Sequence, residues 1–521
     1  MTNLVTDVAE TAAASPDIVA VSYDGQDVTY EAFWRQVGQF AQALSDAGVE
    51  PGDRVALYLP NLPQYVTGFF GTLRAGGIVV PMNPQYKSRE ISHLLDDSGA
   101  KAVVALADLV PQVREVQDDT SVETVVSVGG DAESAVAFED FLADEELPIV
   151  ERDDDDVAVQ PYTSGTTGKP KGVLLTHGNI TFTARASVEI MPDGVEDTDT
   201  FLGVLPLFHI YGMTVTMIAT LFFGGTYRPV PEWDAQEAAR IIEEEDITVM
   251  HGVPAMYNDI VNQPNADEFD LSSIRFTNSG GASIPIEVID RFEELFDVQL
   301  NEGYGLTETS PVTHANRPDA RRKGSIGKTL PGVESKIVDG SFETVPTVES
   351  GPVDEEEADL DEITGELVIH GPNVMKGYYE LPGANEGAFT EDAEGKRWFH
   401  TGDVGYWDED GYFYVVDREK HMIVTGGYNV YPREVEELLF EHPDVADAAV
   451  VGIPDERRGE TVKAFVVPTP DAEATPEDIK QYCLENLAEY KHPREVEFVD
   501  ELPRTTTGKV QKFELRGEDA A

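Results

Sequence analysis

The sequence predicts an α/β fold: a large N-terminal domain of helix-covered, mostly parallel sheets with a β-rich subdomain, and a small C-terminal α+β domain. Helical and strand-like patterns alternate from Thr29 to Asn301, as in runs of βα units. From about Gly324 the helical period disappears, and after Asp417 helices return among the strands. The chain of 521 residues also exceeds what a single hydrophobic core usually holds.

The alternation begins with an amphipathic helix after Thr29, which is a possible N-cap. Phe33, Val37, Phe40 and Leu44 fall on one face of this helix. The pattern then predicts strands over 55–59, 78–80 and 102–105 and helices over 63–74 and 88–95. This is the βα order of a parallel sheet.

The next block continues the alternation after a buried loop. The expected elements are helices over 213–223, 235–245 and 286–296 and strands over 248–253, 274–278 and 298–301. Ligands bind at the carboxyl ends of such strands, where glycine-rich turns allow close approach. Gly281 and Gly303 follow two of the strands, so we expect them at the mouth of a site.

The β-rich subdomain is expected over 324–416, inside a large domain of residues 1–417. Residues 341–363 are acidic and lack a clear pattern, which indicates a surface insertion. Residues 408–411 (DEDG) resemble part of a calcium loop but lack the EF-hand spacing. A hairpin turn between Tyr406 and Tyr412 is the favoured interpretation.

Residues 418–521 are predicted to form a separate α+β domain of ordinary size. A helix is expected over 433–440, with strands over 446–453, 462–467 and 496–499. Another helix opens at Thr475, with Pro476 in its first turn. A basic tail ends the sequence.

The chain is strongly acidic, with 98 Asp and Glu against 37 Lys and Arg and a net charge of −61. Such a surface repels nucleic acid and anionic membrane. The 41% apolar content and 23 Phe argue against disorder. Because the acids are spread along the whole chain, we interpret them as a salt-adapted surface for a cytosol at molar salt.

Single features of the sequence argue against disulfides, cysteine-based metal sites, secretion and a membrane span. The one cysteine, Cys483, excludes an internal disulfide and a Cys-based metal site. The N-terminus is neither basic nor followed by an apolar core, so no signal peptide is expected. The longest uncharged run, 201–227, is broken by Pro206 and Gly212, so it indicates a buried loop and helix rather than a membrane span. We therefore expect a cytoplasmic protein.

The stretch YTSGTTGKPKGV at 162–173 carries the strongest chemical signal. Glycines allow close backbone approach, hydroxyls donate hydrogen bonds, and lysines add positive charge, as a polyphosphate requires. It is not a Walker A loop, because Thr163 and Pro170 stand where that motif needs Gly and a hydroxyl. A solvated connector is the alternative, but two lysines without an acid favour a nucleotide loop. Its candidate residues are Thr163, Ser164, Gly165, Thr166, Thr167, Gly168, Lys169 and Lys171.

This stretch resembles the signature phosphate loop of the adenylate-forming superfamily, which includes acyl-CoA synthetases, adenylation domains and beetle luciferases. Further stretches resemble the same family in its order: PLFHIYG at 206–212, GYGLTET at 303–309, TGD at 401–403 with DR at 417–418, TGGYNVYP at 425–432 and PRTTTGKVQK at 503–512. The resemblance extends from about Thr29 to Arg516.

The resemblance implies a role for each matching residue. Nucleotide contacts beyond the loop fall on Gly281, Ala282, Glu302, Gly303, Tyr304, Thr307, Asp403, Arg418, Lys420 and Lys509. The acyl group would meet His209, Tyr211 and Gly280, and the CoA arm would pass Gly426 and Gly427. Catalysis would fall to Lys509, Thr307 and Glu308, of which Glu308 would hold Mg²⁺.

Within these roles, Tyr304 would stack on adenine, and Asp403 with Arg418 would grip the ribose hydroxyls. Lys420 would be the hinge about which a mobile C-terminal domain rotates. Val424 stands where many relatives carry a lysine, so no role for that charge carries over.

The resemblance implies an ATP-dependent carboxylic acid–CoA ligase that uses ATP, CoA and Mg²⁺ and acts on medium- or long-chain fatty acids. An aryl or short-chain acid ligase, or an adenylation enzyme that loads a carrier protein, remains open. A luciferase-type oxygenase and a nucleotide-binding scaffold are more distant alternatives. A homodimer is possible.

Overall fold

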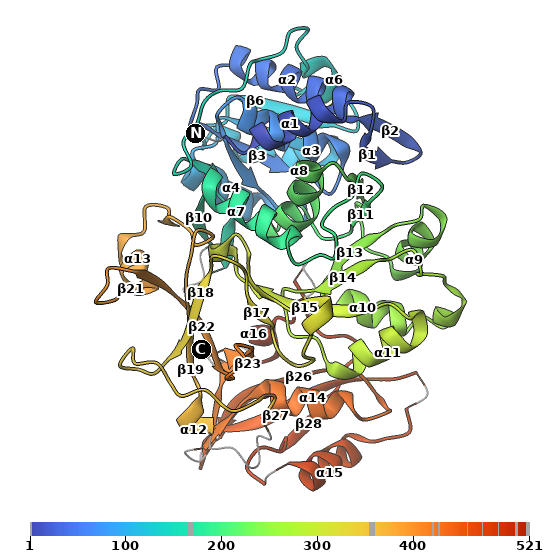
Figure 1. Ribbon diagram of the computed structural model, residues 1–521, viewed down its shortest axis with the longest axis vertical. Coiled ribbons are helices and arrows are strands. Elements are labelled where there is room, and N and C mark those ends of the chain that lie inside the picture. The colour runs from blue at the N-terminus through green and yellow to red at the C-terminus, as the bar shows by residue number, and fades with distance from the viewer. Residues whose placement is uncertain are drawn as a thin grey trace.

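The computed structural model describes residues 3–164, 170–353, 360–418, 421–425, 428–455, 457–470, 472–487, 489–505 and 509–516. The chain is elongated, with the N-terminal sheet and its helices at one end and the C-terminal sheet at the other (Figure 1). Two nine-stranded sheets form most of the first part.

The first nine-stranded sheet is parallel through its centre and antiparallel at both edges. Its order is β17 (Lys328–Thr329), β16 (Val312–Ala315), β15 (Leu300–Gly305), β14 (Phe276–Ser279), β13 (Val249–Gly252), β11 (Thr200–Gly203), β12 (Thr226–Pro229), β1 (Val19–Tyr23) and β2 (Gln26–Thr29). Strands β13, β14 and β15 are neighbours, so their carboxyl ends lie at one edge.

The second nine-stranded sheet is also mostly parallel but is antiparallel at only one edge. Its order is β20 (Gly377–Tyr378), β10 (Pro170–Thr176), β8 (Val157–Val159), β4 (Ile78–Pro81), β3 (Arg54–Tyr58), β5 (Ala102–Leu106), β6 (Thr124–Val128) and β7 (Val136–Ala137), and β9 (Tyr162–Ser164) pairs with β10. Strands β3 to β8 are parallel, while β9 and β20 are antiparallel to β10. The prediction of mostly parallel sheets is confirmed.

Helices cover these sheets. They are α1 (Val5–Ala14), α2 (Tyr30–Asp46), α3 (Pro63–Arg74), α4 (Ser88–Ser98), α5 (Val110–Gln117), α7 (His177–Val188), α9 (Ala235–Glu244), α10 (Pro254–Val261) and α11 (Ile286–Phe296). Of these, α2, α3, α4, α9 and α11 lie where the sequence patterns predict helices. Helix α2 begins where expected, because the Thr29 hydroxyl oxygen accepts a hydrogen bond from the Ala32 N–H. Phe33, Val37, Phe40 and Leu44 are all buried on its core face.

The predicted helix over 213–223 differs from expectation in its first half. Residues Gly212–Ile218 form a π-helix, and an α-helix, α8 (Ala219–Phe223), completes the segment. The Thr216 hydroxyl donates to the Gly212 carbonyl and the Thr220 hydroxyl to the Thr216 carbonyl, and such bonds compete with regular helical N–H donors. In the described ranges, no helix combines the length and the apolar character needed to cross a bilayer.

The predicted strand over 298–301 also differs, because β15 starts at Leu300 and continues to Gly305. Beyond Glu302, which still pairs with Ser279, the strand leaves its parallel neighbour and pairs antiparallel with β16. The extension carries Gly303 and Tyr304 beyond the last residue of β14.

A third sheet forms the β-rich part, in the order β18 (Glu334–Val338), β19 (Gly365–His370), β22 (Arg397–Trp407) and β21 (Phe389–Glu391), with β23 (Phe413–Arg418) paired to β22. Trp407 pairs with Phe413, which confirms the predicted hairpin. The described part of 341–363 is not only a surface insertion: Val345 is buried, and the Val348 N–H donates to the Trp407 carbonyl over 3.0 Å. Apolar side chains at these two positions pull the segment onto the hairpin.

The fourth sheet lies near the C-terminus, in the order β25 (Tyr428–Val430), β24 (Ile423–Thr425), β27 (Gly459–Pro468) and β26 (Val445–Asp455), with β28 (Glu495–Phe498) beside β27. Helices α14 (Pro432–Phe440), α15 (Pro476–Asn486) and α16 (Lys512–Leu515) accompany it (Figure 1). Its own apolar core includes Ile423, Val435, Val450 and the free, buried Cys483. A boundary at residue 418 stays a prediction.

Candidate functional site

The predicted phosphate loop connects β9 to β10, an antiparallel pair in which Thr163 lies opposite Lys171. Gly165, Thr166, Thr167, Gly168 and Lys169 lie outside the described residues. Ser164 ends β9, and Lys171 Nζ lies 5.0 Å from the centre of the Tyr378 ring.

A cavity of about 280 Å³ lies between the ends of the first sheet, the β22–β23 hairpin and the C-terminal part. It is lined by many of the predicted nucleotide-binding residues, namely Gly281, Ala282, Glu302, Gly303, Tyr304, Asp403, Arg418 and Lys509. These residues come from five separate places in the sequence, so folding brings them together.

Glycines at the strand ends shape one wall. Gly281 follows β14 with φ of +85°, a conformation that favours glycine. A Cβ on Gly303 would lie 3.1 Å from Asn278 Nδ2. Glycine is therefore favoured at both positions, at Gly281 by its backbone conformation and at Gly303 by the neighbouring Asn278 side chain.

Asp403 and Arg418 face each other across the hairpin strands that carry them. Arg418 Nε lies 2.9 Å from Asp403 Oδ1, and the Tyr304 hydroxyl donates to Asp403 Oδ2. The Asp403 charge raises the pKa of Arg418, and burial followed by that same charge raises the pKa of Tyr304. One carboxylate thus links the extension of β15 to the hairpin.

Glu302 is a buried acid in the cavity wall. Glu302 is only 4% exposed to solvent. Its Oε2 atom has no hydrogen-bond partner among the described residues. Burial raises the pKa of Glu302 to about 7, although the positive charge of Arg433 acts in the opposite direction. Arg433 comes from α14, so charges of the two parts of the chain meet at this acid.

Thr307 and Glu308 lie in a 3₁₀ turn, Thr307–Thr309, directly after β15. The Tyr378 hydroxyl donates to Glu308 Oε1 over 3.0 Å, and the Met375 N–H donates to the Glu308 carbonyl over 2.8 Å. In the part of the chain that the structure describes, no group of three or more His, Cys, Asp or Glu side chains could hold a metal ion. The single carboxylate of Glu308 suits Mg²⁺, which takes one or two protein carboxylates together with phosphates.

The predicted acyl residues form a second cluster beside the cavity. The Tyr211 N–H donates to His209 Nδ1 over 3.2 Å, and the Tyr211 hydroxyl accepts from Asn278 Nδ2 over 3.0 Å. A Cβ on Gly280 would lie 3.0 Å from the Tyr211 ring, so this glycine makes room for it. Burial, together with the positive charge of Lys509, lowers the pKa of His209 to about 4. The charge of Lys509, in the basic C-terminal stretch, therefore acts on the predicted acyl motif.

The predicted hinge residue Lys420 and the predicted CoA residues Gly426 and Gly427 lie outside the described residues. Val424, which precedes the glycine pair by two positions, is 43% exposed. The predicted CoA contacts therefore stay a prediction.

Sequence reasoning missed some residues at the site. Arg433, Arg504 and Lys512 line the cavity, and Tyr378 supports Glu308. The basic character of the C-terminal tail was a usable signal for Arg504 and Lys512. Tyr378 lies in strand β20, which is only two residues long and is therefore too short to show an alternating hydrophobic pattern in the sequence.

A site built at parallel strand ends and closed by a smaller C-terminal sheet defines an enzyme that holds a nucleotide between two parts of its chain. Residues 8–379 match the family model described as AMP-binding enzyme, and residues 434–509 match the AMP-binding enzyme C-terminal domain. The chain belongs to the AMP-binding enzyme family.

The curated relatives are similar over nearly the whole chain. A long-chain-fatty-acid–CoA ligase of Bacillus subtilis is 36% identical, with 98% of this chain and 93% of the relative covered. A feruloyl-CoA synthase of an Amycolatopsis species is 37% identical, with coverage of 97% and 96%.

Among solved structures, ATP-bound MatB of Rhodopseudomonas palustris is similar with a TM-score of 0.88 at 28% identity, covering 99% of this chain and 98% of that one. Apo MatB covers the same shares with a TM-score of 0.78. The arrangement of this chain is thus closer to that of the ATP-bound protein.

Proposed function

We propose that this chain is an ATP-dependent carboxylic acid–CoA ligase that forms acyl-CoA through an acyl-adenylate. The observation that carries the proposal is the position of Lys509, which lines the cavity of Asp403 and Arg418 and acts electrostatically on His209. The family match supports it, as do the names of two curated relatives, a long-chain-fatty-acid–CoA ligase and a feruloyl-CoA synthase.

The chemistry needs two steps because a carboxylate is a poor acyl donor. The carboxylate oxygen attacks the α-phosphorus of ATP, and pyrophosphate leaves. The CoA thiol then attacks the acyl carbonyl, and AMP leaves with the electron pair of the broken C–O bond. One difficult substitution is thereby divided into two easier ones.

The work of the first step is divided between residues of the cavity and the turn of Thr307 and Glu308 that follows β15. Lys509 and Thr307 stabilise the charge that gathers on the α-phosphate, and Asp403 with Arg418 hold the ribose. Glu308 would hold Mg²⁺, which when bound neutralises phosphate charge. Tyr304 and the Gly281–Ala282 turn hold the adenine, and Glu302 lies beside it.

The second step requires a different arrangement. Lys509 and the predicted CoA residues Gly426 and Gly427 lie on the same C-terminal part, and we propose that it rotates about Lys420 between the steps. Support comes from the greater similarity to ATP-bound than to apo MatB and from the exposure of Val424. The present arrangement is then the one that makes the adenylate.

The preferred acid is proposed to be a medium- or long-chain fatty acid, after the Bacillus subtilis relative. The feruloyl-CoA synthase relative keeps an aryl acid as the second candidate. Thioester formation across fatty acids of increasing length, ferulate and short acids, measured in molar KCl, decides between them. Pyrophosphate release with purified CoA against a carrier protein separates a CoA ligase from a carrier-loading enzyme.

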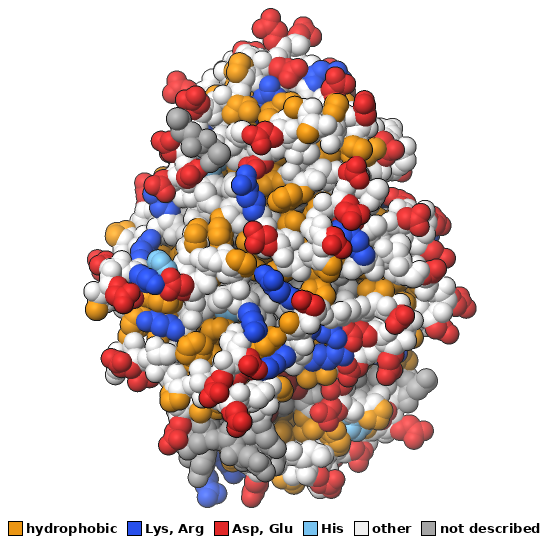
Figure 2. Space-filling model, viewed as in Figure 1, with side chains coloured by type: hydrophobic (Ala, Val, Ile, Leu, Met, Phe, Trp, Pro, Cys, Tyr) orange, Lys and Arg blue, Asp and Glu red, His pale blue; other side chains and the backbone are white. Residues whose placement is uncertain are grey.

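We also propose that the protein is halophilic and works in the cytoplasm, where ATP and CoA are available. Figure 2 shows acidic side chains over the whole visible face rather than in one patch, as expected of a surface adapted to molar salt. A homodimer is a further proposal, which light scattering at molar KCl would test.

A further inference from the structure

The turn of the β22–β23 hairpin is held by an arginine from a distant segment. Arg322 Nη1 pairs with Asp408, and its Nη2 pairs with Asp410. The guanidinium carbon also lies 4.2 Å from the centre of the Tyr412 ring. One side chain therefore contacts both ends of the turn that joins the strands of Asp403 and Arg418.

Asp408 is a buried carboxylate that depends on this arginine. Its side chain is 0% exposed. Its Oδ1 accepts the Tyr412 N–H over 2.9 Å, and its Oδ2 accepts the Tyr414 hydroxyl over 3.1 Å. Breaking a buried ion pair leaves an uncompensated charge, so loss of Arg322 would disturb the turn strongly.

The backbone of Arg322 is tied to the opposite wall of the cavity. The Arg322 N–H donates to Asn316 Oδ1 over 2.9 Å, and the Asn316 N–H donates to the Glu302 carbonyl over 2.9 Å. A chain of contacts thus runs from β15, through Asn316 and Arg322, to the hairpin turn.

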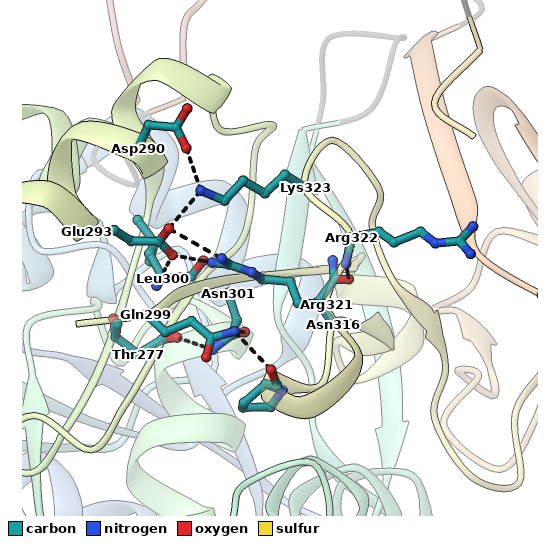
Figure 3. Close-up of polar contacts among 11 residues, drawn as sticks. Thr277, Asp290, Glu293, Gln299, Leu300, Asn301, Asn316, Arg321, Arg322 and Lys323 are labelled. Atoms are coloured by element: carbon teal, nitrogen blue, oxygen red, sulfur yellow. Dashed lines mark hydrogen bonds and ion pairs between the residues drawn. The ribbon is translucent and has the colours of Figure 1, made fainter. Parts of the chain in front are cut away.

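The two residues beside Arg322 in the sequence, Arg321 and Lys323, form ion pairs with α11 instead of the hairpin turn, and Arg321 also contacts β15. Arg321 Nη1 donates to the Leu300 carbonyl over 2.6 Å and pairs with Glu293, while Lys323 Nζ lies 2.7 Å from Glu293 Oε2 and pairs with Asp290. Figure 3 shows the Arg322 side chain pointing away from this cluster. Arg321 therefore joins α11 to β15 and Lys323 holds its own segment to α11, whereas Arg322 holds the hairpin.

We propose that Arg322 is a positioning residue for nucleotide binding, because it sets the hairpin so that Asp403 and Arg418 meet the ribose hydroxyls at a fixed distance from β15. The proposal rests on the ribose role given to that pair in the proposed function. Backbone bonds from Phe413 to Ile326 and Gly327 hold the start of β23, and Arg322 holds the turn beyond them.

The test compares ATP with 2′,3′-dideoxy-ATP in acid-dependent pyrophosphate release. Hydrogen bonds to charged groups predict that the wild type prefers ATP by about 100-fold in kcat/KM. We expect Arg322→Ala to reduce this preference roughly 10-fold and to raise the KM for ATP, with the KM for CoA unchanged. Lys323→Ala, which also loses two ion pairs, is the matched control and should keep the full preference.

A second variant, Arg322→Lys, distinguishes loss of nucleotide positioning from misfolding. Arg322→Lys keeps a charge near Asp408 but cannot reach both carboxylates with a planar fork, so an intermediate preference is expected. If the Arg322 variants melt earlier but keep the wild-type preference, the residue is only structural and the inference is overturned. If the wild type releases no pyrophosphate with any acid, the proposed function itself fails.

Discussion

The Tyr378 hydroxyl donates a hydrogen bond to Glu308 Oε1 over 3.0 Å. Strand β20, which carries Tyr378, pairs with β10, which carries Lys171, and the lysine ammonium lies 5.0 Å from the centre of the phenol ring. A single side chain thus joins the strand after the phosphate loop to the proposed magnesium ligand.

Replacing Tyr378 with Phe should raise the Mg²⁺ concentration that half-saturates adenylate formation by about 10-fold or more, because partners of a ligand orient it. Magnesium titration of acid-dependent pyrophosphate release measures this. Tyr379→Phe is the control, since that ring lies under Arg54 instead. An unchanged magnesium dependence in Tyr378→Phe would show that the hydrogen bond does not orient Glu308.

Replacing Lys509 with Ala should lower adenylate formation by about 10²-fold or more, which is the scale for losing one preorganised charge stabiliser. Thioester formation from supplied acyl-adenylate should be largely spared, because the proposed second arrangement moves Lys509 away. Single-turnover assays of the two steps measure both effects. Lys480→Ala, a change on α15 beside Glu477, is the control. Equal losses in both steps would contradict the two-arrangement mechanism.

Glu302 should make stability fall as pH rises. The folded carboxyl keeps its proton to about pH 7, while the unfolded carboxyl loses it near 4.5, so the contribution present below 4.5 is lost between these values. Glu302→Gln should match the wild type at pH 4.5 or below and be more stable at pH 8, by up to about 3 kcal/mol. Urea unfolding in molar KCl at both pH values measures the difference. A variant less stable than the wild type at pH 8 would refute the buried-acid account.

Removing salt should unfold the protein. At about 0.1 M KCl the screening length grows to about 10 Å, so the repulsion of 98 acidic side chains against 37 basic ones is no longer suppressed. Circular dichroism and ligase activity should both fall between molar KCl and this concentration. Choline chloride at equal ionic strength separates screening from specific potassium binding. If circular dichroism and activity do not change during this titration, the proposal that the protein is halophilic is wrong.

Elements with strong local signals were predicted closely from the sequence. Helix α3 has the predicted bounds, and α2 begins after its Thr29 cap, because helical period and capping are properties of adjacent residues. The π-helical turn at Gly212–Ile218 escaped prediction, since buried threonine hydroxyls and tight packing decide it. The extension of β15 to Gly305 was also not predicted, because it depends on pairing with β16, which forms only in the folded protein.

The residue types of the site were present in the sequence by itself: glycines after strands, a hydroxyl-rich loop, Asp403 ahead of Arg418 and a terminal Lys509. These residue types can be recognised from sequence because each motif consists of residues that are adjacent in the chain. Only the tertiary structure decided that Tyr378 bonds Glu308, that Arg322 holds the hairpin turn and that Glu302 is buried with a raised pKa. These depend on contacts between distant segments and on exclusion of water, neither of which any single stretch of sequence contains.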